Sequence, residues 1–385
     1  MTHPVQYYSP WFRFINRECP EIQLKVIYGT VPTPEQQGVG FGVSFEWDTS
    51  PLDGYDFVQL RPSRSDDYLH FDRFFGLDVR GMGRAIRDSR ADAVVVPGWY
   101  SSTLARALVA CRIHRIPTVY RGDTPFTAKS GIRSIAWSLK TKAMLDFFNA
   151  YLTVGTRNRE YLEHFGVPGS KIHFSPSCVD NEVFSSVAEH TRAGRASARA
   201  RLGIPDENFA ILFVGKLDDN KRPWDVIAAA AALGEKTTAV IVGSGPEMDR
   251  TRNEAARLDV HALFPGFINQ SALGEVYAAA DVCVLSSTSE TWGLVVNEAL
   301  ASGTPCIASD GVGCAPDLIA RGVTGEIYPV ADVSALSGAL AQIRGEISRG
   351  HNFAEDCRRV ASRYSFSTAT EGLVAAVRSL VNPRS

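Results

Sequence analysis

The feature that most constrains the fold is a regular alternation of short apolar runs and helical segments in the second half of the sequence. The apolar runs are rich in β-branched residues, and segments with helical spacing separate them. The apolar runs occupy residues 210–217, 237–247, 262–268, 281–287 and 304–310. Continuous apolar runs of this length are typical of buried parallel strands. Their alternation with helices predicts a parallel, doubly wound α/β sheet.

The first half alternates in the same way but less cleanly. A polar stretch rich in arginine and alanine lies between the halves, and we interpret residues 185–206 as a linker. A chain of 385 residues is long enough for two domains. We predict one Rossmann-like domain at 1–185, a second at 186–366, and a helix within 367–385 that crosses back to the first domain. Ligands are expected in a central cleft that the two domains face.

Composition and charge exclude several functional classes. The formal net charge is −2 and there is no run of lysine or arginine, so nucleic-acid binding is not predicted. No apolar run reaches the length of a membrane span, and residues 1–14 lack the pattern of a secretory signal. The seven cysteines are scattered without a C-x-x-C pair, which is typical of reduced thiols in a cytoplasmic protein. Neither metal-ligand spacing nor a strict D-x-D motif is found.

The segment 286–310 predicts a phosphate site. It follows an apolar strand, contains a helical pattern that stops at Gly303, and leads into the next strand. The backbone N–H groups of Gly293, Leu294 and Val295 are unpaired at the helix start, where the positive end of the helix dipole favours a phosphate.

Two carboxylates flank this helix start. A helical wheel places Glu298 away from the sheet-facing side, so that it looks out at the carboxyl edge of the sheet, about 7 Å along the axis from the phosphate position. An acid there can accept hydrogen bonds from a ribose diol. Glu290, on the preceding loop, can accept from sugar hydroxyls. The alternative is that both are solvated acids near a helix N-terminus, where the dipole favours them without any ligand.

Five stretches resemble the family 4 glycosyltransferases, which have the GT-B fold. They are "GVPGSKIHFSPSCVDNEVF" (166–184), "FVGKLDDNKRP" (213–223), "VGSGPE" (242–247), "FPGFI" (264–268) and "SETWGLVVNEALASGTPCIAS" (289–309). The first of them closes the predicted first domain, and the other four lie in the second. In the first half, "HPVQYYSPWF", "EWDTSPLDGY" and "YRGDTP" look like a bacterial branch of the family, of polysaccharide or glycoconjugate type. The resemblance covers nearly the whole chain. The E-x7-E spacing alone is weak, but all the elements in order are specific.

The resemblance implies roles for the second domain. Lys216 and Lys221 match the basic pair that holds the donor diphosphate, Glu298 matches the acid on the ribose, and Glu290 matches the acid on the donor sugar. Two cations beside a departing diphosphate also suit the chemistry, because its charge grows as the bond breaks. The remaining implied donor-binding residues are Gly245, Gly266, Phe267 and Ile268, the last three in the loop whose backbone touches the base. The alternative for the lysines is a solvated strand end.

In the family, the first domain usually selects the acceptor. The sequence of this domain departs from the family's motifs at two places. "THPVQYYSP" stands where many members have a Gly-Gly turn, which leaves His3 as the candidate phosphate contact, and the strand expected before it is missing or very short. Asp123 stands where many members have a histidine, and is the candidate contact for a donor sugar hydroxyl or the acceptor. Its alternative is a turn aspartate that caps the next segment. The helix at 132–148 is either a membrane-docking surface or an ordinary core-packing helix.

The reaction that the resemblance implies is transfer of a sugar with retention, from a UDP-sugar in preference to a GDP-sugar. The acceptor is a glycan, a lipid-linked glycan or a small molecule. Neither a metal nor another cofactor is expected, and the departing phosphate takes the acceptor proton. We expect a cytoplasmic enzyme, peripheral on the inner face of the membrane if the helix at 132–148 docks there. Two alternatives remain: a nucleotide-sugar 2-epimerase of the same architecture, and a non-catalytic sugar- or nucleotide-binding protein.

Overall fold

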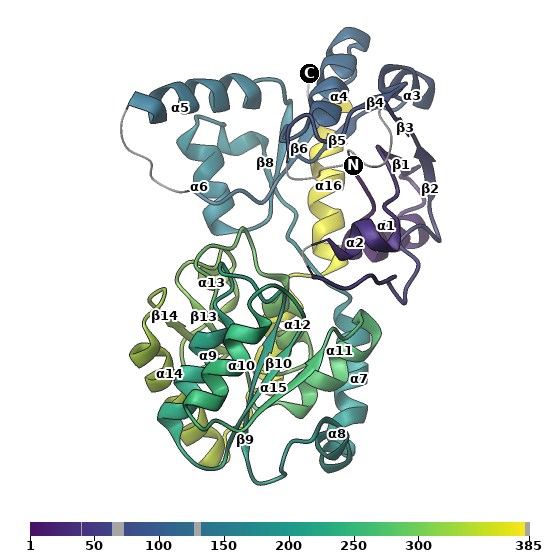
Figure 1. Ribbon diagram of the computed structural model, residues 1–385. Coiled ribbons are helices and arrows are strands. Elements are labelled where there is room, and N and C mark those ends of the chain that lie inside the picture. Colours follow the sequence, from purple (N-terminus) through teal and green to yellow (C-terminus); the bar gives the residue numbers. More distant parts are fainter. Residues whose placement is uncertain (40, 64–72, 127–131, 382–385) are drawn as a thin grey trace. The chain divides into compact units, whose positions relative to one another are not determined.

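A computed structural model describes residues 1–39, 41–63, 73–126 and 132–381 (Figure 1). The chain forms two compact units. The first comprises Met1–Thr33, Ser50–Ser177 and the chain from Phe366 onward, and the second comprises Pro34–Thr49 and Cys178–Ser365. The units therefore separate at residue 177 rather than at the predicted 185. In addition, a segment of the first half, Pro34–Thr49, belongs to the second unit.

The second unit contains one parallel sheet of six strands. The strands lie in the order β11-β10-β9-β12-β13-β14. From β9 the chain adds β10 and β11 on one side and then β12, β13 and β14 on the other, so the direction of winding reverses between β9 and β12. Their bounds are Phe209–Val214 (β9), Thr237–Val242 (β10), Ala262–Gly266 (β11), Val282–Leu285 (β12), Cys306–Ser309 (β13) and Gly325–Tyr328 (β14). Every residue of β9, β10, β12 and β13 is buried, because helices cover both faces. The predicted doubly wound sheet is confirmed.

The helices of the second unit pack in two groups. In one, α9 contacts α10 and α14; in the other, α12 contacts α7, α11 and α15. Their bounds are Pro34–Gly38 (α2), Asn181–Ala193 (α7), Arg195–Leu202 (α8), Pro223–Leu233 (α9), Met248–Arg257 (α10), Gln270–Ala279 (α11), Leu294–Ala301 (α12), Ala315–Leu318 (α13), Val333–Ser348 (α14) and Ala354–Ala361 (α15).

The predicted linker at 185–206 is wrong, because α7 and α8 occupy it. The polar composition without large apolar residues suggested a linker. Alanine and arginine are, however, strong helix formers, which explains why the segment is helical. Both helices instead pack against α11: the ring of Phe184 in α7 lies 6.2 Å from the ring of Tyr277, and Arg199 Nε of α8 donates to the Ala279 carbonyl at 3.0 Å.

The first unit contains a divided set of strands. A parallel sheet in the order β5-β6-β7-β8 is accompanied by the parallel pair β1–β2 and the antiparallel pair β3–β4. The bounds are Lys25–Tyr28 (β1), Asp56–Gln59 (β2), Arg61–Pro62 (β3), Val79–Arg80 (β4), Val94–Val96 (β5), Thr118–Arg121 (β6), Ala150–Thr153 (β7) and Ile172–Phe174 (β8). The backbone of Met1 and Thr2 bonds to Gly29 and Thr30, beside the end of β1.

Helix α16 completes the first unit although it follows the second unit in sequence. It packs on β7 and β8, and the approach is so close that a Cβ on Gly372 would lie 1.9 Å from the carbonyl oxygen of Phe174. Trp11 Nε1 donates to Thr370 Oγ1 at 2.9 Å. The helices of this unit are Tyr8–Glu18 (α1), Met82–Ser89 (α3), Ser102–His114 (α4), Ile132–Leu145 (α5), Thr156–His164 (α6) and Phe366–Val381 (α16), with a 3₁₀ turn at Gly169–Lys171 (η2).

Across the described ranges, none of the helices combines the length and the apolar character that crossing a bilayer requires. All seven cysteines are free thiols; six are buried and Cys19 is half-buried.

Candidate active site

The candidate site lies at the carboxyl edge of the sheet in the second unit, where β9 and β12 are neighbours. Here the strand order changes direction, and open α/β sheets bind ligands at such switch points. Lys216 and Lys221 follow β9, and Glu290 follows β12. The topology therefore brings together three residues that are distant in sequence.

Asn220 ties the two loops of this edge together. Its carbonyl oxygen accepts from Thr288 N at 2.7 Å, its Nδ2 donates to the Ser289 carbonyl at 2.9 Å, and its Oδ1 accepts from Ser289 N at 3.2 Å. Ser286 Oγ adds a bond to the Lys221 carbonyl at 2.8 Å. The lysine loop and the glutamate loop consequently form one rigid arrangement.

The central contact is an ion pair between Lys221 Nζ and Glu290 Oε2. The side chains are only 19% and 21% exposed, so water screens the pair less than it would at the surface. Ser287 Oγ also donates to Glu290 Oε2, at 3.3 Å. Lys216 Nζ lies 3.8 Å from Asp218 Oδ2 and is more exposed. The edge thus holds two cations, each beside a carboxylate.

Glycines let the backbone of this edge close up. Gly245 has φ 156°, and a Cβ there would lie 2.4 Å from the Leu217 carbonyl oxygen. The loop after β10 therefore touches the loop that carries Lys216, through a bond from Leu217 N to the Ser244 carbonyl at 2.9 Å. The contact of Gly245 with a donor stays a prediction, but its need for glycine has this direct steric cause.

Gly293 caps the start of α12 in a left-handed conformation, with φ 107°. The preceding loop is pinned to the end of β13, because Glu290 N donates to the Gly311 carbonyl and Gly313 N donates to the Glu290 carbonyl, at 3.1 and 3.0 Å. Leu294 and Val295, the first helical residues, are half-buried. The expected helix start therefore lies directly after the Glu290 loop.

The predicted outward orientation of Glu298 is wrong. Its side chain is 1% exposed, and Oε2 accepts from Tyr277 OH of α11 at 2.7 Å. The helical wheel assumed one solvent-facing side, whereas α7, α11 and α15 surround α12. A helix that is apolar nearly all round is a buried helix. A buried carboxylate is costly without polar partners, and the Tyr277 hydroxyl is one such partner of Glu298.

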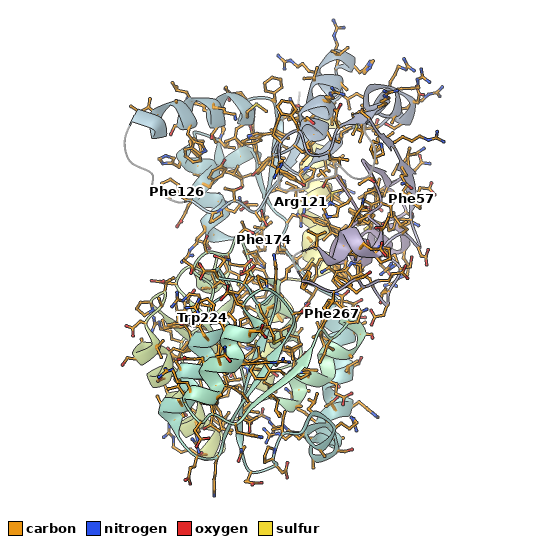
Figure 2. All side chains as sticks on the ribbon, viewed as in Figure 1. Phe57, Arg121, Phe126, Phe174, Trp224 and Phe267 are labelled. Atoms are coloured by element: carbon orange, nitrogen blue, oxygen red, sulfur yellow. The ribbon has the colours of Figure 1, made fainter. Side chains whose placement is uncertain are left out.

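Residues 41–49, which we call the strap, were missed as part of the site. Three of its rings surround Phe267 of the predicted base loop (labelled in Figure 2): Phe45 at 4.3 Å between centroids, Phe41 at 5.9 Å and Trp47 at 6.3 Å. Asn269 Nδ2 also donates to the Glu46 carbonyl at 2.7 Å. Three aromatic residues within seven positions are the only sequence signal of this contact. The neighbouring predicted residues, Gly266 and Ile268, are half-buried.

The candidate residues of the first unit lie around Tyr100. His3 Nδ1 is 3.1 Å from Thr2 Oγ1, which is in turn 3.2 Å from Tyr100 OH. Burial, followed by the N-terminal ammonium group, lowers the pKa of His3 to about 4. Asp123 is exposed after β6, and its charge contributes, after burial, to a raised pKa of Tyr100. His3 and Asp123 therefore belong to one polar neighbourhood.

Within the described residues, His, Cys, Asp and Glu side chains form no group of three or more that is arranged to hold a metal ion.

Two family models together match most of the chain. The model described as "Glycosyltransferase Family 4" matches residues 31–183, and the model described as "Glycosyl transferases group 1" matches residues 194–359. The second match contains every candidate residue of the second unit except the strap.

Curated relatives carry the name D-inositol 3-phosphate glycosyltransferase. The protein from Corynebacterium glutamicum is 30% identical over 295 residues, covering 72% of this chain and 68% of the relative. The protein from Geodermatophilus obscurus is 32% identical over 232 residues, covering 57% of this chain and 49% of the relative. With the latter relative and with that of Thermomonospora curvata, the chain spans only about half of the relative's length, at 49% and 53%.

Solved structures resemble the chain over almost its full length. Anabaena HepE in complex with UDP has a TM-score of 0.75 at 16% identity and covers 98% of each chain. The sucrose-phosphate synthase of Thermosynechococcus elongatus has a TM-score of 0.71 at 18% identity, covering 97% of this chain and 92% of the other. At these identities the likeness concerns the fold alone.

Proposed function

Because the chain belongs to family 4 of the glycosyltransferases and has the GT-B fold, we propose that it transfers a sugar, with retention, from a nucleotide-sugar donor to an acceptor hydroxyl. The observation that carries the proposal is the ion pair of Lys221 with Glu290 at the switch point of the second sheet. A site that combines fixed cations with hydrogen-bond acceptors suits a ligand that has both a diphosphate and sugar hydroxyls.

In this proposal Lys216 and Lys221 bind the donor diphosphate. The bond from the anomeric carbon to the diphosphate oxygen breaks, and the two ammonium groups stabilise the negative charge that develops on the leaving group. The acceptor hydroxyl attacks the same carbon from the same face and forms the new glycosidic bond. Its proton passes to the departing phosphate oxygen. No side chain needs to act as a general base, and no metal is included.

The two glutamates orient the rest of the donor. Glu290 accepts from sugar hydroxyls while it remains paired with Lys221, and Ser287 fixes its rotamer. Glu298 accepts from the ribose diol, and Tyr277 holds it in place. The backbone at Gly293, Leu294 and Val295 faces the phosphate, and the loop Gly266–Ile268 contacts the base.

For the donor we favour UDP-sugars over GDP-sugars, in keeping with the UDP complex of HepE. The acceptor is a glycan, a lipid-linked glycan or a small molecule, and the names of the curated relatives favour a phosphorylated cyclitol for the last class. His3 and Asp123 are the first-unit residues proposed to contact the phosphate and the sugar or acceptor. The seven free cysteines support a reducing compartment, and hence the cytoplasm.

Nucleotide release tests the proposal. The protein is incubated with UDP-, GDP- and ADP-sugars, with and without acceptors that include inositol phosphates, and products are analysed by NMR. We expect UDP release that depends on the acceptor, and a product with the donor's anomeric configuration. An inverted product would refute retention. Conversion to a new nucleotide sugar without acceptor would indicate an epimerase, and thermal stabilisation by nucleotides without turnover would indicate a binding protein.

A further inference from the structure

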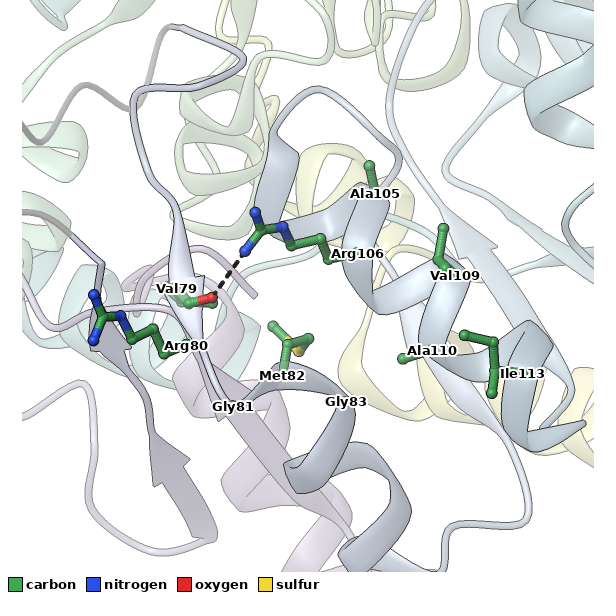
Figure 3. Close-up of a pocket in the computed structure, with 10 residues that line it drawn as sticks. All are labelled: Val79, Arg80, Gly81, Met82, Gly83, Ala105, Arg106, Val109, Ala110 and Ile113. Carbon is green, nitrogen blue, oxygen red and sulfur yellow. Dashed lines mark hydrogen bonds between the residues drawn. The ribbon is translucent and has the colours of Figure 1, made fainter.

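We propose that the groove between α3 and α4 of the first unit docks the protein on the surface of an anionic lipid bilayer. This α3–α4 groove has a volume of about 570 Å³. Figure 3 shows Met82 and Gly83 of α3 on one side and Ala105, Val109 and Ile113 of α4 on the other. The proposal does not rest on the glycosyl transfer proposed above, because it concerns a separate surface.

The α4 side of the groove is an exposed apolar stripe. Ala105, Val109 and Ile113 are spaced four residues apart and therefore share one side of the helix. Val109 is 51% exposed and Ile113 70%. The inner side of α4 is also apolar, since Leu104 and Leu108 are buried in the core. Exposed apolar side chains that share one side of a helix with arginines beside them form a candidate interaction surface.

The charge around the groove is strongly positive. Residues 73–115 contain eight arginines against three aspartates and no lysine or glutamate, a net charge of +5 in a chain whose total is −2. Arg80 and Arg106 line the groove and are exposed. Arg106 is held by Asp78 at 2.9 Å and by the Val79 carbonyl at 3.4 Å, the latter drawn as a dashed line in Figure 3. The nearby Arg84 and Arg112 are exposed as well.

An apolar centre with an arginine rim matches the interface of an anionic bilayer. Valine and isoleucine side chains reach the boundary between headgroups and acyl chains, while guanidinium groups bind lipid phosphates. The sequence left open whether the helix at 132–148, which the structure defines as α5, plays this role or is an ordinary core-packing helix. Its Trp137 and Met144 pack against the core, which agrees with the core-packing alternative. Its exposed Ile135 and Leu139 nevertheless make it the rival surface.

Vesicle flotation tests the proposal with the full chain. We expect the wild type to float with vesicles of phosphatidylglycerol and phosphatidylcholine and not with phosphatidylcholine alone, with binding that weakens as salt is raised. Val109→Asp combined with Ile113→Asp should lower binding at least about tenfold, the factor expected when one large apolar side chain is no longer buried. Arg80→Gln with Arg84→Gln should lower binding to the anionic vesicles as well.

The matched control is Ile135→Asp combined with Leu139→Asp on α5, which introduces the same two negative charges at residues that are 61% and 66% exposed. It should bind anionic vesicles like the wild type, and melting curves of all variants should coincide because the changed side chains are exposed. A wild type that binds neither vesicle, or equal binding to both, would overturn the proposal. So would a loss of binding in the α5 variant but not in the groove variant. A dimer that only the groove variant dissociates, without vesicle binding, would assign the groove to a second copy instead.

Discussion

The two units differ in how their polar candidates are held. In the second unit, one continuous sheet of six strands fixes the loops that carry Lys216, Lys221 and Glu290, and bonds through Asn220 join those loops. In the first unit the strands that the structure describes are divided among three sheets, and Asp123 lies exposed on a loop. Preorganised groups contribute most to catalysis. Substitutions in the second unit should therefore have larger effects on the chemistry than substitutions in the first.

The largest effect is expected for the two lysines. Lys221→Ala and Lys216→Ala should each lower kcat/KM by about 100-fold or more, the scale on which one oxyanion-type donor acts. Lys216→Arg should be tolerated better, because its side chain is more exposed and its charge survives, whereas Lys221 needs a compact ammonium group beside Glu290. Steady-state kinetics with a UDP-sugar measures this. Near-wild-type transfer by both alanine variants would remove the donor site from the second unit.

The next effect separates the two glutamates. Glu298→Ala should weaken UDP binding by about 10- to 100-fold, since a lost hydrogen bond to a charged group is worth about 1.5–3 kcal/mol. Glu290→Ala should mainly slow turnover. Tyr277→Phe is the control for the buried orientation of Glu298, because it removes one hydroxyl and keeps the ring. If Tyr277→Phe binds UDP as tightly as the wild type while Glu298→Ala does not, the tyrosine only fills space. Calorimetry with UDP distinguishes these outcomes.

A smaller effect should come from the strap. Phe45→Ala should weaken UDP binding by about 2- to 10-fold with little change in kcat, since an aromatic pair contributes about 0.5–1.5 kcal/mol and the effect acts through Phe267. The matched control is Phe75→Ala in the first unit, an exposed ring that should leave UDP binding unchanged. If both substitutions changed UDP binding equally, the strap would have no specific role in binding, and the proposed difference between the two units would be wrong.

The smallest effect concerns His3. Burial holds its folded-state pKa at about 4, below the ordinary 6.5, so the unfolded chain binds a proton that the folded chain does not. The contribution of neutral His3 to stability should be fully present above pH 6.5 and decline as the pH falls towards 4. NMR of the imidazole C–H signals should show a neutral ring at pH 5.5 in the folded protein. A midpoint near 6.5 would show that the ring is solvated.

The periodicity of the sequence was sufficient for the sheet of the second unit, whereas the grouping of Lys216 and Lys221 with Glu290 was predicted from the resemblance to the family. Two local rules failed for physical reasons. The wheel for Glu298 assumed a solvent face that α12 lacks, and the polarity of 185–206 concealed two helices that pack against α11. The contact between the strap and the loop Gly266–Ile268 could not be predicted from local sequence patterns, because Glu46 and Asn269, which bond to each other, are 223 positions apart in the sequence.

The packing of α16 has a consequence for synthesis on the ribosome. The first unit is closed by Gly372 against Phe174 and by Thr370 against Trp11, yet residues 178–365, which make up most of the second unit, are translated between these partners. At about 5–20 residues per second, residues 178–365 impose a wait of roughly 10–40 s. During this time β7 and β8 lack their covering helix. We therefore expect the nascent first unit to depend on chaperones during this wait, while the second unit can finish folding as it emerges.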